Sequence, residues 1–295
     1  MYDIKKVYEA YTIEDIIKLR QAHPKAILIG GGSDVLIKIR EGKMAGSELI
    51  SIYLCDELRG IDILDDGSLR VGALSSFTTI TENDLVQKCC PTLGEAVDTA
   101  GGPQLRNIAT IGGNLSNGVP SADSATTVLA YDAIIELQGA NGVREVPATE
   151  FYLGFGKVDI KADEVLTAIK IKKESYENYH GHYFKYAMRN AMDIATSSCS
   201  VNIKLSDNNI VEDARAAYGV AGPTPTRVFE AENWFKGKEF NDENMKEFAK
   251  KALDELAPRD SWRASKALRT QLLYEICYRS LKEIEVKYKG GQNAH

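Results

Sequence analysis

The segment "GGGSDVLI", residues Gly30–Ile37, directly follows the apolar run Ala26–Ile29. Glycine costs backbone entropy and adds no side chain to a core, so three consecutive glycines need a structural reason. We expect that reason to be a group that lies against the bare backbone. Turns without Cβ atoms can direct successive N–H groups into one concavity, which then binds an anion such as a phosphate.

A second glycine cluster, "TIGGN" at Thr110–Asn114, strengthens this interpretation. Two facing concavities would suit a pyrophosphate, and the side chains of Ser33, Thr110 and Asn114 could donate further hydrogen bonds. Neither cluster is a familiar nucleotide loop. The first lacks the Lys-Ser/Thr ending of a Walker loop and has Val35 in place of the third Rossmann glycine. For each cluster, a tight turn without a ligand remains the alternative.

The overall composition is that of an ordinary globular protein. The chain has 295 residues, a formal net charge of −6 and a hydrophobic content of 44%, which is enough for two domains. The negative charge argues against a nucleic-acid groove. No apolar run approaches the roughly 18 residues of a membrane span, and the N-terminal residues lack the apolar core of a signal peptide. We therefore expect a cytoplasmic protein that binds neither nucleic acid nor membrane.

The cysteines and histidines do not indicate a metal site. The five cysteines include no CxxC pair, and the adjacent Cys89 and Cys90 form a poor chelate, so we expect packed or half-exposed thiols. His180 and His182 would need an acidic or cysteine partner to hold a metal ion, and a solvated turn is their expected setting. We expect no metal or iron–sulfur centre in this chain.

The first part of the chain predicts a small α/β unit. Thr12 and Asp15 have the spacing of a capping box, which predicts a helix that ends before Pro24. Strands are expected at Ala26–Ile29 and near Leu49–Tyr53.

The middle of the chain predicts two β-hairpins, which turn at Asp66-Gly67 and Asn141-Gly142. Helices are expected at Thr78–Lys88 and Leu93–Ala100. Between them and the second hairpin, Gly101–Ala133 is long and rich in Gly, Asn and Ser, so we expect a functional loop there.

Beyond a polar boundary at Ser175–Gly181, the pattern changes again. The expected elements are strands at 183–189, 196–205 and 214–220, and helices at 244–256 and from Ser265 onward. This order of elements predicts the α+β class.

Three stretches together resemble one known family. They are "ILIGGGSDVLIKI" (27–39), "GGPQLRNIATIGGNLSNGVPSADS" (101–124) and "FKYAMRNAMDIAT" (184–196). In this order and spacing they are similar to the FAD-binding subunit of molybdenum hydroxylases, a family that includes xanthine dehydrogenase and carbon monoxide dehydrogenase. The segments 121–126 and 257–269 favour the separate flavin subunit of three-subunit bacterial xanthine dehydrogenases.

The resemblance implies a domain organisation. A two-lobed FAD-binding domain, similar to that of vanillyl-alcohol oxidase, would span residues 1–176, with a small lobe at about 1–56 and a larger lobe at about 57–176. A C-terminal domain of antiparallel strands and helices would span 177–295. FAD would lie extended in the cleft between the two lobes.

The resemblance also implies the FAD-binding residues, with no catalytic residue and no metal ligand among them. Ile27–Asp34 would form the first pyrophosphate loop, and Ala109–Asn114 the second, which also approaches the flavin. Asp123 would lie near the dinucleotide, Leu166 would pack its backbone on the cofactor, and Lys185 would lie close to the isoalloxazine, where its charge favours reduced flavin. The full set is Ile27, Leu28, Ile29, Gly30, Gly31, Gly32, Ser33, Asp34, Ala109, Thr110, Ile111, Gly112, Gly113, Asn114, Asp123, Leu166 and Lys185.

Simpler local roles remain open for several of these residues. Lys185 could be a strand lysine with its ammonium group in water. Asp123 could cap a helix that begins at Ser124. Trp262 and Arg263 could cap the last helical region, or they could contact a cofactor or a partner subunit.

The function that the resemblance implies is electron relay. Electrons taken from a heterocycle, with a purine expected, at the molybdenum centre of one partner subunit would pass through the 2Fe–2S clusters of another to FAD, and then to NAD. Two other classes remain open. A stand-alone FAD-dependent oxidase or reductase would need a substrate-side acid or base, and a non-catalytic nucleotide-binding module would show no flavin absorbance.

Overall fold

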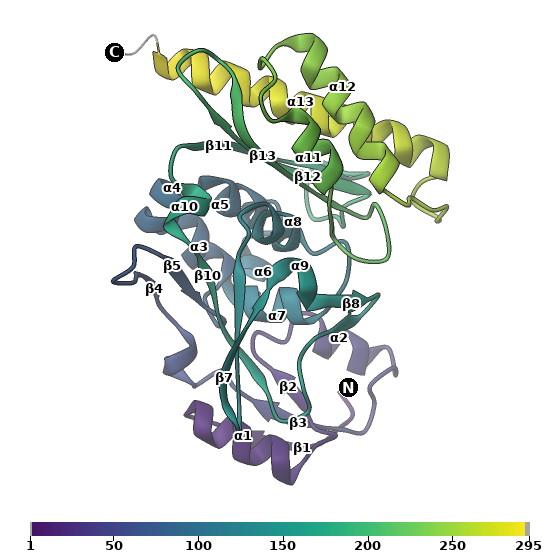
Figure 1. Ribbon diagram of the computed structural model, residues 1–295. Helices are drawn as coiled ribbons and strands as arrows, with labels where there is room; N and C mark the ends of the chain where they lie inside the picture. Colours follow the sequence, from purple (N-terminus) through teal and green to yellow (C-terminus); the bar gives the residue numbers. More distant parts are fainter. Residues whose placement is uncertain (1, 293–295) are drawn as a thin grey trace.

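The elements of the first lobe, at the bottom of Figure 1, are β1 (Ile4–Glu9), α1 (Ile13–Ala22), β2 (Ile27–Ile29), α2 (Val35–Arg40), β3 (Ser47–Ser51) and the 3-10 helix η1 (Asp56–Leu58). The computed structural model describes residues 2–292. The strands form a parallel sheet in the order β1-β3-β2. The side chain of Thr12 accepts from the N–H of Asp15, and the Asp15 carboxylate accepts from the N–H of Thr12. The predicted capping box is therefore confirmed.

The second lobe contains an antiparallel sheet in the order β4 (Ile61–Ile63), β5 (Leu69–Gly72), β10 (Val165–Ile171), β6 (Ile134–Gly139) and β7 (Gly142–Pro147). Its outer pairs are the two hairpins that the sequence predicts. At their turns, Gly67 and Gly142 have positive φ angles of 81° and 103°, which glycine adopts without strain. The central strand β10 is buried at nearly every position.

The remaining elements of this lobe are α3 (Phe77–Glu82), α4 (Asp84–Cys89), α5 (Pro91–Asp98), α6 (Pro103–Ile108), α7 (Ile111–Ser116), α8 (Asp123–Ala130), α9 (Ala148–Phe151), the hairpin strands β8 (Tyr152–Gly154) and β9 (Lys157–Val158), and α10 (Lys173–Tyr176). The expectation of a long loop at Gly101–Ala133 is therefore wrong, because α6, α7 and α8 occupy most of it. Pro103 begins α6 at a position where a missing N–H costs nothing. The helix predicted at Thr78–Lys88 is divided in two, because Asn83 ends α3 and its side chain caps α4.

The C-terminal part, at the top of Figure 1, consists of the antiparallel strands β11 (Tyr179–Tyr186), β12 (Ser197–Leu205), β13 (Val211–Gly219) and β14 (Thr226–Arg227), followed by α11 (Phe229–Phe235), α12 (Asp242–Ala252), the 3-10 helix η2 (Leu253–Glu255) and α13 (Lys266–Gln292). The sheet is covered on both faces. α11 and α13 pack on one face, while α5 and α8 of the second lobe pack on the other. Most residues of β12 are buried for this reason.

His180 and His182 lie in β11, so the solvated turn expected for them is wrong. His182 Nδ1 lies 3.5 Å from the Glu95 Oε2 atom of α5, and the His180 ring packs edge-on against Tyr288. Contacts with two other elements therefore stabilise a strand whose polar sequence resembles a turn.

The architecture as a whole is α+β, as the sequence predicts. The division into domains at residues 1–176 and 177–295 stays a prediction, and residues 293–295 lie outside the described residues. No helix within residues 2–292 combines the length and the apolar composition that a membrane crossing requires.

A buried ion network joins the C-terminal sheet to the second lobe. Arg227 of β14 donates to the two carboxylate oxygens of Glu232 at 2.7 and 2.6 Å and to the main-chain oxygen of Leu129 at 2.9 Å. It also pairs with Asp132, which follows α8. The side chains of Arg227 and Glu232 are only 4% and 5% exposed, so each charge depends on the other for compensation.

We predict that Glu232→Gln lowers the free energy of unfolding by about 3 kcal/mol, because it leaves part of a buried guanidinium charge uncompensated. Glu230→Gln on the same helix is the matched control, since Glu230 is exposed, and its effect should stay within about 0.5 kcal/mol. Urea unfolding followed by circular dichroism measures both. Equal stability of the two variants would contradict the role given to the network.

Candidate functional site

The two glycine segments lie directly against each other. A Cβ atom added to Gly31 would lie 1.6 Å from the main-chain oxygen of Ile108, which is the last residue of α6. A Cβ atom on Gly30 would lie 3.5 Å from Thr110 Oγ1 and 3.0 Å from Leu74 Cδ2. The group that lies against the bare backbone of Gly31 is therefore the end of α6, directly before the second segment.

The first segment presents open N–H groups. Within residues 2–292, no protein acceptor is found for the main-chain N–H groups of Gly30, Gly31, Gly32, Ser33 or Asp34. Gly32 has a positive φ angle of 72°, which allows the chain to turn from β2 into α2. Main-chain N–H groups rarely stay without an acceptor or water. This segment therefore has the donors that an anion needs.

The second segment differs from the open concavity that the sequence suggested. The N–H of Ile111 donates to Ser75 O at 3.2 Å, that of Gly112 to Ala73 O at 2.9 Å, and that of Gly113 to Thr110 Oγ1 at 3.2 Å. The N-cap Thr110 of α7 accounts for the last of these bonds, and the chain between β5 and α3 supplies the acceptors of the other two. The segment can still offer contact surface, because Gly113 is exposed and Asn114 is partly exposed.

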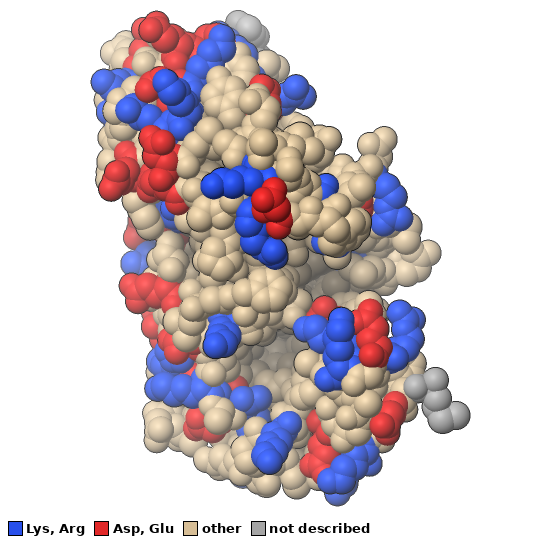
Figure 2. Space-filling model, turned by 90° about the vertical axis from the view of Figure 1, so that its right-hand side faces the viewer, with Lys and Arg blue, Asp and Glu red and all other residues tan. Residues whose placement is uncertain are grey.

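A half-exposed strand precedes the first segment. Ile27, Leu28 and Ile29 form β2, which pairs with β3 on one side only, and none of the three is fully buried. Figure 2 shows a hollow on the side of the molecule that carries α2 and β8, with a largely uncharged floor. Ile37 and Ile108 are exposed apolar residues next to the two glycine segments. These apolar surfaces could pack against a ligand whose anionic part reaches the open N–H groups.

A buried polar cluster joins the second lobe to the C-terminal sheet. Lys185 Nζ donates to Asp123 Oδ2 at 3.1 Å and to Thr99 O at 3.0 Å, and the Tyr183 hydroxyl donates to Asp123 Oδ1 at 2.9 Å. The Lys185 side chain is 8% exposed, so its ammonium group does not lie in water. Asp123 does not cap α8 either, because Ala122 occupies the N-cap position and Asp123 is the first helical residue.

Burial raises the pKa of the Asp123 carboxyl above its ordinary value, while the charge of Lys185 and the hydrogen bonds from Lys185 and Tyr183 act in the opposite direction. Burial likewise raises the pKa of Tyr183 well above that of a free phenol, so this hydroxyl remains a neutral donor. The cluster lies close to the second glycine segment, because Ser124 Oγ and Asn114 Oδ1 are joined by a hydrogen bond of 2.7 Å.

Leu166 has its side chain buried in the core of the second lobe. It lies on β10 opposite Leu137, next to an irregularity in the β10–β6 pairing. Only its main chain could therefore reach a cofactor.

Three residues of the buried polar cluster are not among the site residues predicted from the sequence: Thr99, Ser124 and Tyr183. Tyr183 could have been found from its spacing, because residues two apart in a strand share a face and Lys185 was already a candidate. For the Thr99 carbonyl and the Ser124 hydroxyl, the sequence offers no comparable signal.

Trp262 and Arg263 do not cap α13. Asp260 Oδ1 and Ser265 Oγ accept from the first N–H groups of that helix. Trp262 is 77% exposed, and the guanidinium carbon of Arg263 lies 4.2 Å from its ring centre.

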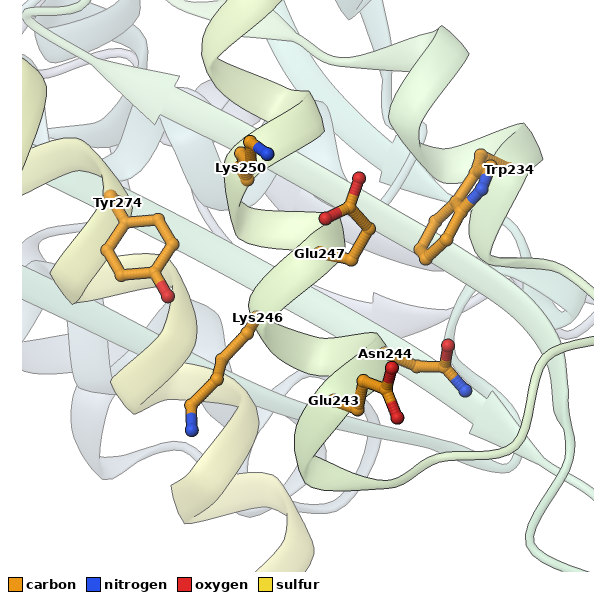
Figure 3. A pocket seen from close by; sticks show the side chains of 7 residues that line it. All are labelled: Trp234, Glu243, Asn244, Lys246, Glu247, Lys250 and Tyr274. Carbon is orange, nitrogen blue, oxygen red and sulfur yellow. The ribbon is translucent and has the colours of Figure 1, made fainter.

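A separate surface cavity of about 440 Å³ lies on the C-terminal helices, lined by Trp234, Glu243, Asn244, Lys246, Glu247, Lys250 and Tyr274. Figure 3 shows these side chains spread over α12, between Trp234 of α11 and Tyr274 of α13. Lys246 is paired with Asp242 at 2.7 Å. Among the described residues, no group of three or more His, Cys, Asp or Glu side chains could hold a metal ion. We therefore take the glycine segments and the Asp123 cluster as the candidate cofactor site.

Two protein-family models match most of the chain. Residues 2–172 match the FAD binding domain in molybdopterin dehydrogenase, and residues 182–284 match the CO dehydrogenase flavoprotein C-terminal domain. The chain is 40% identical, over 99% of both chains, to the xanthine dehydrogenase FAD-binding subunit of Escherichia coli O157:H7. It is 29% identical to the carbon monoxide dehydrogenase medium chain of Hydrogenophaga pseudoflava, over 91% of this chain and 92% of that one.

The fold is also similar to that of a solved structure. A chain of carbon monoxide dehydrogenase from Hydrogenophaga pseudoflava superimposes with a TM-score of 0.90 at 27% identity, covering 96% of this chain and 97% of that one. The expected resemblance is confirmed, and the protein belongs to the family of FAD-binding subunits of molybdopterin dehydrogenases.

Proposed function

We propose that this chain is the FAD-binding electron-transfer subunit of a xanthine dehydrogenase-like molybdenum hydroxylase, and that residues 1–176 hold the cofactor. The observation that carries the proposal is the row of N–H groups at Gly30–Asp34, which have no acceptor among residues 2–292. These donors lie beside the half-exposed strand β2 and the exposed Gly113. A dinucleotide needs such a combination, because its pyrophosphate is anionic while its rings are largely apolar.

Each segment would make different contacts with FAD. The loop Ile27–Asp34 would hold the pyrophosphate through its main chain. Ala109–Asn114 would supply contact surface at Gly113 and polar side chains at Thr110 and Asn114, and Leu166 would contact the cofactor through its main chain. Bound FAD would supply the exchange between one-electron and two-electron transfer.

The Asp123–Lys185 pair would lie near the flavin. Its ammonium group is held by two acceptors, so the position of the charge is defined before FAD binds. A fixed positive charge favours the electron-rich, reduced form of a flavin. These two residues would therefore affect the reduction potential and would transfer no proton to a substrate.

We further propose two partner subunits, one with 2Fe–2S clusters and one with the molybdenum cofactor, and NAD as the electron acceptor. The names of the relatives support a place in such a complex: they are an FAD-binding subunit of xanthine dehydrogenase and a medium chain of carbon monoxide dehydrogenase. The likeness to the xanthine dehydrogenase subunit favours a purine as the substrate of the complex. A cytoplasmic location is supported by five buried, unpaired cysteines, since reduced thiols are typical of that compartment.

The first prediction from this proposal concerns Gly113. A Cβ atom at this position would meet only Thr110 Oγ1, at 2.9 Å, and turning that side chain away costs only the N-cap hydrogen bond of α7, about 1 kcal/mol. Gly113→Ala should therefore keep the fold but weaken FAD binding at least about tenfold, which corresponds to about 1.4 kcal/mol. Quenching of FAD fluorescence during titration of the FAD-free chain measures the dissociation constant.

Gly222→Ala is the matched control, because a Cβ atom there would make only ordinary contacts, at 3.6 Å and beyond. This variant should bind FAD as the wild type does. If Gly113→Ala has the same affinity as Gly222→Ala, the second segment has been wrongly assigned to the cofactor site.

The second prediction separates electron relay from the two other functions. NADH alone should bleach the flavin band of the isolated, FAD-loaded chain, because the proposed exchange with NAD needs no partner subunit. Xanthine alone should leave the band unchanged, because the proposed molybdenum site belongs to another chain. Absorbance at the flavin maximum under anaerobic conditions measures both.

Bleaching by xanthine alone would contradict the relay and favour a stand-alone oxidase. A chain that cannot be loaded with FAD would favour a nucleotide-binding module. If FAD binds but NADH does not bleach it, another acceptor replaces NAD.

A further inference from the structure

We propose that Tyr183, which belongs to the C-terminal sheet, is a positioning residue of the flavin site: its hydroxyl orients the Asp123 carboxylate, which in turn holds the Lys185 ammonium group. This inference rests on the proposed function, because it concerns the potential of a bound flavin. It gives the C-terminal part of the chain a role in the chemistry of a cofactor that the first two lobes would bind.

The geometry makes Tyr183 part of one unit with the other two residues. Tyr183 and Lys185 project from the same face of β11, two residues apart, toward the start of α8. Each of them donates to a different oxygen of Asp123, at 2.9 and 3.1 Å. A carboxylate with a donor on each oxygen cannot rotate without breaking one of these bonds, so the orientation of Asp123 is set from both sides.

The same arrangement leaves one N–H of Lys185 free. An ammonium group has three N–H donors, and within the described part of the chain two of them are used, by Asp123 and by the Thr99 carbonyl. Because the acceptors define the position of the ammonium group, they also define the direction in which its third donor points. Tyr183 contributes to that direction through its hydrogen bond to Asp123.

Few other charges reach this cluster. Lys185 and Tyr183 are the charged and titratable groups that shift the pKa of Asp123. Glu95 of α5 accepts from the N–H of Tyr183 at 3.4 Å, but its charge is paired with Lys287 of α13 at 2.8 Å and lies beside His182. The balance of charge next to the flavin therefore depends on whether Asp123 is ionised.

Removal of the Tyr183 hydroxyl should change that balance in a predictable direction. The hydroxyl stabilises the carboxylate, so its loss raises the pKa of Asp123, which burial has already raised. Once Asp123 binds a proton, the charge of Lys185 is no longer compensated and favours reduced flavin. Relative to the wild type, the potential of bound FAD in Tyr183→Phe should therefore become more positive as the pH falls through the new pKa. At alkaline pH, where Asp123 is ionised in both proteins, the difference in potential between the wild type and Tyr183→Phe should be smallest.

The test is a spectroelectrochemical titration of bound FAD over a range of pH in the wild-type chain, Tyr183→Phe, Asp123→Asn and Tyr186→Phe. Tyr186→Phe is the matched control, because Tyr186 lies on the opposite face of the same strand and is 41% exposed. Its potential should follow the wild type at every pH. Asp123→Asn imitates the protonated carboxyl, so its potential should be more positive than that of the wild type at alkaline pH as well.

A purely structural role of Tyr183 would lower stability or FAD affinity without a pH-dependent change of potential. The proposal is overturned if Tyr183→Phe has the wild-type potential at every pH, or an offset that does not vary with pH. If Tyr183→Phe fails to fold, a wild-type potential in Asp123→Asn overturns the proposal independently. Failure of the wild-type chain to bind FAD would instead contradict the proposed function.

Discussion

The close approach of Gly31 to the Ile108 carbonyl is the contact on which the arrangement of the site depends. A side chain as small as that of alanine would place a carbon atom 1.6 Å from that oxygen, so the two segments can meet only where one of them has no Cβ atom. The contact links the loop after β2 in the first lobe with the turn between α6 and α7 in the second. Gly31 is therefore required by the protein itself as well as by a ligand.

The two glycine clusters differ in the acceptors that their N–H groups meet, and therefore have different roles. In the second cluster, α7 begins, and its N–H groups donate to Thr110 and to the chain at Ala73 and Ser75. The first cluster connects a strand to a helix, and no such acceptors face its N–H groups within the described chain. The anion-binding capacity of the site therefore lies mainly in one loop, which the other loop supports and borders.

The features of the fold that could be predicted from the sequence are those that depend on neighbouring residues. The capping box of Thr12 and Asp15 and the hairpin turns at Gly67 and Gly142 need no information from elsewhere in the chain. The helices within residues 101–133 could not be predicted in this way. The sequence of α7, with two glycines and an asparagine, has low helix propensity. Contacts with other elements stabilise these helices: α6 packs on α3, α7 on α8 and β10, and α8 on β12 and β13.

In the candidate site, too, only the features that depend on neighbouring residues could be predicted from the sequence. The glycine patterns and the family resemblance indicated both loops, because each loop is continuous in sequence. That Asp123, Tyr183 and Lys185 form one cluster could not be predicted, because about sixty residues separate the first from the others and the C-terminal sheet brings them together. For the same reason, the sequence could not predict that the main-chain carbonyl groups of Ala73 and Ser75 accept from N–H groups of the second loop.

Hydrogen–deuterium exchange of the FAD-free and FAD-loaded chain tests the central claim most directly, because it reports on individual N–H groups. The account predicts that FAD strongly slows exchange in a peptide that covers residues 30–34, whose donors are open without a ligand. Exchange at residues 111–114 should be slow already and should change little, since these N–H groups donate within the protein. Protection by FAD that appears at residues 111–114 and not at residues 30–34 would contradict the account.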